Sequence, residues 1–183
     1  MPIGLSFHLQ VNLGWSVDVA VFKGKIYVLT NLGGLGILNL SSHPILTLLK
    51  VENTPNLSSD MQLVASDDEL LMVDFHAFKQ PKVYKLNFLR MEWLKVGNLG
   101  DQALFLGDLK CSAIRNPTRW GGRSNCLYHI EFATSTCYSY SLDGEILEIF
   151  PIVDKDQARS LWYVSPLWYF PHQCNTVDFL YED

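Results

Sequence analysis

Short apolar runs separated by turn residues recur along most of this chain. Residues 17–22 and Lys25–Thr30 flank the pair Lys23-Gly24, and residues 137–142 and 145–149 flank Asp143-Gly144. A glycine-containing pair between two such runs is typical of a tight β-hairpin, because glycine adopts the backbone angles that the turn requires. No long stretch repeats its apolar residues with the 3.6-residue period of a helix. The pattern therefore predicts an all-β fold built from antiparallel hairpins.

The same pattern predicts further strands. We expect them at residues 35–40, 62–65, 69–75, 82–87, 92–96, 103–106 and 125–132. Residues 26–49 carry no charge and are long enough to cross a bilayer, but glycine, asparagine and proline interrupt them, so we predict two strands and a turn there instead of a membrane helix. A loop at residues 50–60 and a short helix at residues 154–161 complete the prediction.

Three strand-opening segments resemble one another, at residues 24–29, 68–73 and 125–130. Their starts are 44 (68 − 24) and 57 (125 − 68) residues apart. A period of about 40–50 residues with several short strands per unit is typical of the blades of a β-propeller. A plain β-sandwich also has short strands but lacks this recurrence. We expect one domain over residues 1–183, a partial or small β-propeller of about four blades.

Composition narrows the possible partners. The chain has 14 Lys and Arg against 19 Asp and Glu, a net charge of −5, and no basic block, so we expect no nucleic-acid partner. The first 17 residues lack the basic start and the unbroken apolar core of a secretion signal. We therefore expect no membrane association and a location in the cytoplasm, the nucleus or both.

No motif for catalysis or metal binding stands out. The four cysteines, at positions 111, 126, 137 and 174, form no C-x-x-C pair, so reduced thiols are favoured over a disulfide framework or a zinc site. The glycine-rich stretch at residues 32–36 precedes no helix, which makes a turn the better interpretation than a phosphate site. Asp67-Asp68-Glu69 fits a hairpin tip at least as well as a cation site. We predict no catalytic residue, no cofactor and no metal.

The best candidate for a partner-binding segment is residues 114–124, a non-repetitive stretch before a strand. It contains Arg115, Arg119, Trp120 and Arg123. Arginine and tryptophan are enriched among the residues that dominate binding energy at protein interfaces, and loops on a rigid scaffold commonly carry binding residues. The alternative is an ordered loop whose Trp120 packs into the core.

Four stretches resemble, in order, the plant F-box-associated family whose C-terminal part is a KIB-type β-propeller. They are residues 15–40, 63–73, 83–107 and 125–130, followed by Trp168-Tyr169-Phe170-Pro171. The third stretch is the most specific, with Leu99-Gly100-Asp101 leading into the apolar run at residues 103–106. The resemblance implies a propeller that, in full-length relatives, is the substrate-selecting part of a ubiquitin-ligase adaptor. Trp93, Phe105 and Trp168 are expected to anchor its core.

The chain departs from the family pattern at its start. We see no leucine- and proline-rich helical run before Trp15, so we expect no F-box and no docking to a Skp1-type adaptor. Three hypotheses follow, in order of preference: a protein-interaction module, a truncated or decayed family member without a partner, and an enzyme. We consider two arrangements of the blades. Either residues 1–11 pair with the acidic C-terminal segment and close a small ring, or the ring stays open and the protein associates through its terminal blades. We favour the open ring.

Overall fold

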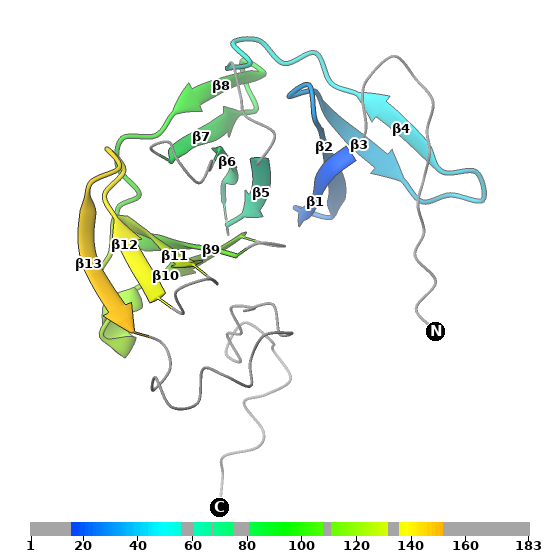
Figure 1. The fold of residues 1–183 in the computed structure, drawn as a ribbon. Coiled ribbons are helices and arrows are strands. Elements are labelled where there is room, and N and C mark those ends of the chain that lie inside the picture. The colour runs from blue at the N-terminus through cyan, green and yellow to red at the C-terminus, as the bar shows by residue number, and fades with distance from the viewer. Residues whose placement is uncertain are drawn as a thin grey trace, which may run out of the picture.

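The computed structural model describes residues 16–55, 61–66, 68–74, 81–107, 111–131 and 136–151. Within these ranges the elements are strands, apart from one 3-10 helix, so the predicted all-β fold is confirmed. The strands form three sheets that stand side by side around a common centre, as the blades of a propeller do (Figure 1). We call β1–β4 blade 1, β5–β8 blade 2 and β9–β13 blade 3.

Blade 1 is an antiparallel meander that runs from the centre outwards. Its strands are β1 (Ser16–Phe22), β2 (Lys25–Thr30), β3 (Leu35–Asn39) and β4 (Ile45–Leu48). Lys23 (φ 46°) and Gly24 (φ 73°) both have positive φ, as the predicted tight turn requires. The prediction of two strands in residues 26–49 was wrong, because the turn-forming residues 41–44 separate β3 from an additional strand, β4.

Blade 2 repeats this meander. Its strands are β5 (Met61–Ala65), β6 (Leu70–Asp74), β7 (Lys82–Asn87) and β8 (Glu92–Lys95). The outer strand β8 pairs with Glu52 of the connection from blade 1: the Glu52 N–H donates to the Met91 carbonyl at 2.7 Å, and the Trp93 N–H donates to the Glu52 carbonyl at 3.2 Å. The connecting chain thus covers part of an edge that would otherwise be open to other strands.

Blade 3 has a different strand order, β10-β9-β11-β12-β13. The elements are β9 (Gln102–Leu106), β10 (Cys111–Arg115), the 3-10 helix η1 (Pro117–Trp120), β11 (Cys126–Glu131), β12 (Thr136–Tyr140) and β13 (Ile146–Pro151). β10 folds back on one edge of β9, and β11 then pairs with the other edge in parallel. Neither β10, nor η1, nor this parallel pair was predicted from the local sequence pattern.

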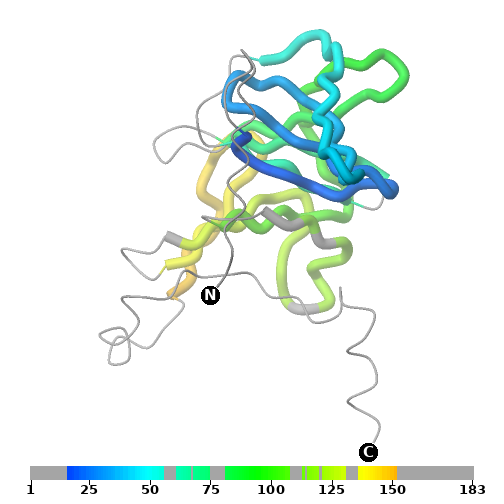
Figure 2. The backbone as a smooth tube through the Cα atoms, turned by 90° about the vertical axis from the view of Figure 1, so that its right-hand side faces the viewer, coloured from blue at the N-terminus to red at the C-terminus, as the bar shows by residue number. Residues whose placement is uncertain are grey.

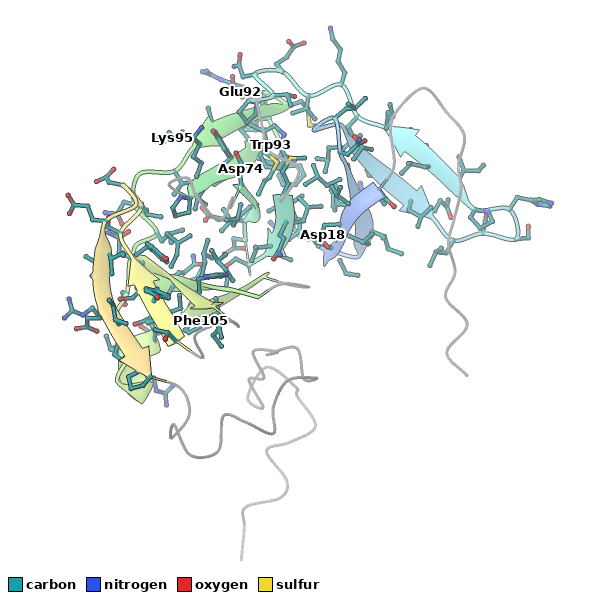
Figure 3. The ribbon with its side chains drawn as sticks, viewed as in Figure 1. Asp18, Asp74, Glu92, Trp93, Lys95 and Phe105 are labelled. Carbon is teal, nitrogen blue, oxygen red and sulfur yellow. The ribbon has the colours of Figure 1, made fainter. Side chains whose placement is uncertain are left out.

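Buried side chains join neighbouring blades. Blades 1 and 2 share a cluster that includes Phe22, Leu29, Met72 and Trp93. Trp93 is 3% exposed, so its predicted burial is confirmed, and Figure 3 labels it on the outer strand of blade 2. Blades 2 and 3 share a second cluster. Its fully buried members include Leu71, Val83, Leu104 and Leu127. Blade 2 thus contributes both of its faces to shared cores, and a third, smaller cluster lies within blade 3 on its other face, formed by Ala103, Cys126, Tyr128 and Cys137.

Hydrogen bonds near the centre also tie the blades together. The Asp18 carboxylate of β1 accepts from the Leu63 N–H of β5 at 2.6 Å, and Figure 3 shows Asp18 on the inner strand of blade 1. Between blades 2 and 3, the Gln62 side-chain amide donates to the Gly107 carbonyl at 2.8 Å. The Ser66 hydroxyl donates to the Gln102 side-chain oxygen at 2.7 Å.

Some predictions fall outside this part of the chain. The short helix expected at residues 154–161 and the anchor Trp168 lie outside the described residues, and the described strands all belong to blades 1–3. The count of about four blades and the question of ring closure therefore stay predictions. Across the described ranges, no helix has the length and apolar character needed to span a bilayer.

Candidate partner-binding surface

The candidate segment begins where β10 ends. Arg115 pairs with Gln102 of β9 as the last residue of the hairpin. Asn116 follows with a left-handed backbone (φ 51°), a conformation that asparagine tolerates better than most residues. Its N–H donates to the Asp101 carbonyl at 2.8 Å. The chain therefore leaves the sheet at a fixed angle.

A single turn of 3-10 helix forms the centre of the segment. Pro117 starts η1, where its fixed φ suits a helix and its missing N–H costs nothing. Gly121 (φ 77°) ends it, and the Gly122 N–H donates to the Pro117 carbonyl at 3.0 Å. A Cβ at Gly122 would lie 3.2 Å from both the Cβ and the carbonyl oxygen of Pro117. The tight closure of this turn therefore depends on glycine at position 122.

Tyr128 of β11 fixes the backbone at Arg123, where the chain leaves the turn. Its hydroxyl accepts from the Arg123 N–H at 2.6 Å, and its ring stacks on Phe105, with centroids 4.8 Å apart. Burial raises the pKa of the Tyr128 hydroxyl, so this group stays neutral at physiological pH. The Cys126 thiol lies next to it and donates to the Arg123 carbonyl at 3.1 Å. Both backbone groups of Arg123 are thus satisfied by β11.

The side chain of Arg123 also reaches the outer strand of blade 3. It forms an ion pair with Glu148 of β13. Both side chains are partly exposed, so we assign the pair no more than about 1 kcal/mol of stability. Its main effect is to fix the loop against β13.

The structure places the four predicted residues close together in the chain: Arg115 ends β10, and Arg119, Trp120 and Arg123 follow in the anchored loop. Arg115 and Arg119 are exposed, and each also interacts with neighbouring groups. Arg123 is exposed and paired with Glu148. Trp120 ends η1, but its side chain lies outside the described part of the structure, so the two alternatives for it stay open.

Two residues that the sequence analysis did not select complete the site. Glu148 lies 25 residues after Arg123, and nothing in the local pattern links the two. Tyr128 falls in the segment 125–130 that resembles other strand openings, which made it look like an ordinary strand residue. Only the folded sheet brings either residue to the loop.

β13, beside the loop, carries apolar side chains at the surface. Ile146 and Ile149 are 54% and 60% exposed, and Leu147 and Phe150 are exposed as well. Among the described strands, none pairs with the outer edge of β13. Phe150 lies on the same face of the sheet as Glu148, the partner of Arg123. Ile146 and Ile149 lie on the other face. Exposed apolar residues near arginines are a composition common at protein interfaces. We call Arg115, Arg119, Arg123 and β13 together the loop surface.

The reactive groups near the loop surface are poor candidates for chemistry. Burial raises the pKa of the Cys137 thiol to about 11 and also raises the pKa of Cys126, so both thiols stay protonated near neutral pH. Within the part of the chain that can be described, no three His, Cys, Asp or Glu side chains gather as a metal site would need. What the geometry offers is a rigid surface with exposed cations and apolar side chains.

Comparison with known proteins identifies the family. The family model described as KIB1-4 beta-propeller matches residues 6–156, which includes every described element. Neither the curated proteins nor the solved structures contain a match to the chain. The three blades around a common centre agree with the architecture that the family description names. The chain therefore belongs to the KIB1-4 β-propeller family.

Proposed function

We propose that this chain is a non-catalytic protein-interaction module whose partner binds at the loop surface of blade 3. The observation that carries the proposal is the anchoring of the loop, which is tied to β9, β11 and β13 while it keeps Arg115 and Arg119 exposed. A surface that is already ordered loses little conformational entropy on binding. The exposed arginines favour an acidic segment on the partner, and the apolar residues of β13 favour apolar neighbours of that segment.

We further propose that the module selects a protein in the way implied by its resemblance to the propellers of plant F-box adaptors. Family membership supports this role, since the propeller is the part shared with the family. We expect the chain in the cytoplasm or nucleus, where the free thiols of Cys126 and Cys137 stay reduced.

Charge reversal of the loop tests the binding proposal. The test variant is Arg115→Glu with Arg119→Glu, and the matched control is Arg90→Glu, which reverses an exposed arginine on blade 2. Partners are recovered from cells that express each tagged form and quantified by mass spectrometry. The strongest partner is then purified and its Kd for each form is measured at low and high salt.

We expect the loop variant to weaken binding by about tenfold or more, and the control to leave it unchanged. Higher salt should weaken the wild-type complex more than the complex of the loop variant, because fewer charges are then paired. Equal loss of binding in the loop variant and the control, with both proteins folded by circular dichroism, would place the interface elsewhere.

A further inference from the structure

One face of blade 1 is apolar over all four strands and forms no described core. Cross-strand partners lie on the same face of a sheet, so the pairing register identifies its members. They are Val19, Val21, Ile26, Val28, Leu38, Leu46 and Leu48, which we call the back face of blade 1. These side chains belong to none of the buried clusters formed by the described residues.

The back face is more exposed than the equivalent faces of the other blades. Blade 1 covers the corresponding face of blade 2, and blade 2 covers that of blade 3. In blade 1, by contrast, Val21 is 67% exposed, Val19 47% and Leu48 38%, whereas Ile26, Leu38 and Leu46 are half-buried and Val28 is buried. Figure 2 looks from this side, with β1–β4 (blue to cyan) on the viewer's side of the other two sheets. A contiguous apolar surface of this kind marks a site of interaction.

The residues just before β1 carry a pattern that fits this face. Every odd position from 3 to 15 is apolar, and every even position is polar or glycine. The apolar residues are Ile3, Leu5, Phe7, Leu9, Val11, Leu13 and Trp15. Strict alternation predicts an extended segment with one apolar side, and such a segment is stable only where that side is covered. Neither the segment nor the back face has a charged side chain, so contact between them leaves no ion unpaired.

Length and connection favour this segment over a second copy of the chain. Four strands span only about 14 Å at about 4.8 Å per spacing, so one blade face offers far less than the roughly 800 Å² per partner of a stable complex. A segment joined directly to Ser16 binds at the high effective concentration of an intramolecular contact. Thirteen extended residues reach about 40 Å, which is ample even after a turn at Gly14.

We propose that the segment before β1 turns at Gly14 and lies across the back face of blade 1 as an apolar cover, with the side chains of Phe7, Leu9 and Val11 against Val19, Val21 and the other back-face residues. The even-numbered polar side chains face water. The cover is independent of the proposed partner site, which lies on blade 3. It protects the exposed face of blade 1 from association with other protein chains.

Thiol labelling of the full chain tests the cover. Val21→Cys places a reporter on the back face, and Ile149→Cys, at a similarly exposed position of blade 3, is the reference reporter. Each is combined with Phe7→Ser, Leu9→Ser and Val11→Ser, which remove apolar side chains from the segment. The matched control is His8→Ser, Gln10→Ser and Asn12→Ser, which change only its polar side. Labelling is read by peptide mass spectrometry at position 21 or 149, so native cysteines do not interfere.

We expect Cys introduced at position 21 to label about tenfold more slowly than Cys at position 149 in the unaltered segment. The apolar-side variant should abolish that difference, and the polar-side control should preserve it. Labelling at position 21 that is as fast as at position 149, or that stays slow in the apolar-side variant, overturns the proposal. Protection that grows with protein concentration also overturns it, because the occupant is then a second copy.

Discussion

Gly122 occupies a position where a methyl group has too little room. An added Cβ would lie 3.2 Å from both the ring and the carbonyl oxygen of Pro117, and that carbonyl is already bonded to the Gly122 N–H. The turn has to open for the methyl group to fit. We expect Gly122→Ala to lower the free energy of unfolding by about 1–2 kcal/mol, measured by urea titration.

Gly97→Ala is the matched control for this prediction. A Cβ at Gly97 meets nothing within 4 Å, and its φ is not in the left-handed region. Since alanine restricts the unfolded chain more than glycine does, we expect no loss, or a gain of up to about 1 kcal/mol. Equal destabilisation by both variants would mean that the methyl contact with Pro117 has no role.

The buried Cys137 thiol should make stability depend on pH in the alkaline range. Burial raises its pKa from 9.0 to about 11, so between these values the unfolded chain loses this proton while the folded protein keeps it. The contribution is complete below pH 9 and is lost as pH rises towards 11. It amounts to at most about 2–3 kcal/mol.

Urea titrations at about pH 8 and about pH 11 measure this effect as a difference between wild type and Cys137→Ala. Removal of the side chain costs packing energy at both pH values, which cancels in the comparison. The wild type should lose more stability than the variant on going to the higher pH. An equal loss in both proteins would show that Cys137 ionises in the folded state as readily as in the unfolded chain.

At the scale of elements, Asp18 links strand β1 to strand β5. Its two carboxylate oxygens accept from the Leu63 N–H at 2.6 Å and from the Val19 N–H at 2.7 Å. Asp18→Ala leaves the partly buried Leu63 N–H without this acceptor, so we expect a loss of about 1–3 kcal/mol. Hydrogen exchange at Leu63 should become faster, because the bond to blade 1 no longer protects that amide.

Two further variants make this test specific. Asp18→Asn keeps one carbonyl-type acceptor and should recover part of the stability. Asp143→Ala removes an exposed carboxylate from a turn in blade 3 and should change neither the stability nor the exchange at Leu63. If Asp18→Asn is as unstable as Asp18→Ala, the negative charge matters more than the hydrogen bond.

The strands that the sequence predicts well are those with local signals. β1 and β2 are marked by Lys23-Gly24, and β12 and β13 by Asp143-Gly144, since these turns depend on residues beside the strands. β4 is short and lies among turn formers, and β10 begins with small residues, so neither stood out. The parallel pairing of β9 with β11 joins strands separated by β10 and η1, and no local pattern encodes it.

The candidate site was predictable to a similar degree. Residue types identified the loop that carries Arg115, Arg119 and Arg123, because arginine in an irregular segment is a local feature. The anchors of that loop, Tyr128 and Glu148, come from strands β11 and β13 and act only once the sheet has formed. The exposed residues of the loop were therefore predictable from the local sequence, whereas the residues that fix the loop were not.

For the molecule as a whole, the shared cores predict cooperative unfolding. Leu29 is fully buried between blades 1 and 2, and Leu104 between blades 2 and 3. Leu29→Ala and Leu104→Ala should each cost about 2–5 kcal/mol. Because blade 2 takes part in both cores, we expect either variant to speed hydrogen exchange in strands of all three blades, measured by mass spectrometry.

Leu89→Ala is the control for this prediction. Leu89 is 98% exposed in the turn between β7 and β8, so its truncation should leave the exchange of every strand unchanged. Faster exchange confined to blade 1 in Leu29→Ala, or to blade 3 in Leu104→Ala, would show that the blades open one at a time.

The strand order of blade 3 has a consequence for a chain made on the ribosome. Blades 1 and 2 add each strand to the one just synthesised, so either sheet can grow as its residues emerge. β9 instead keeps one edge open until residues 107–125 have followed and β11 has appeared. During that interval the exposed edge of β9 is available to strands of neighbouring nascent chains. Slow translation over this stretch should therefore favour aggregation of this protein.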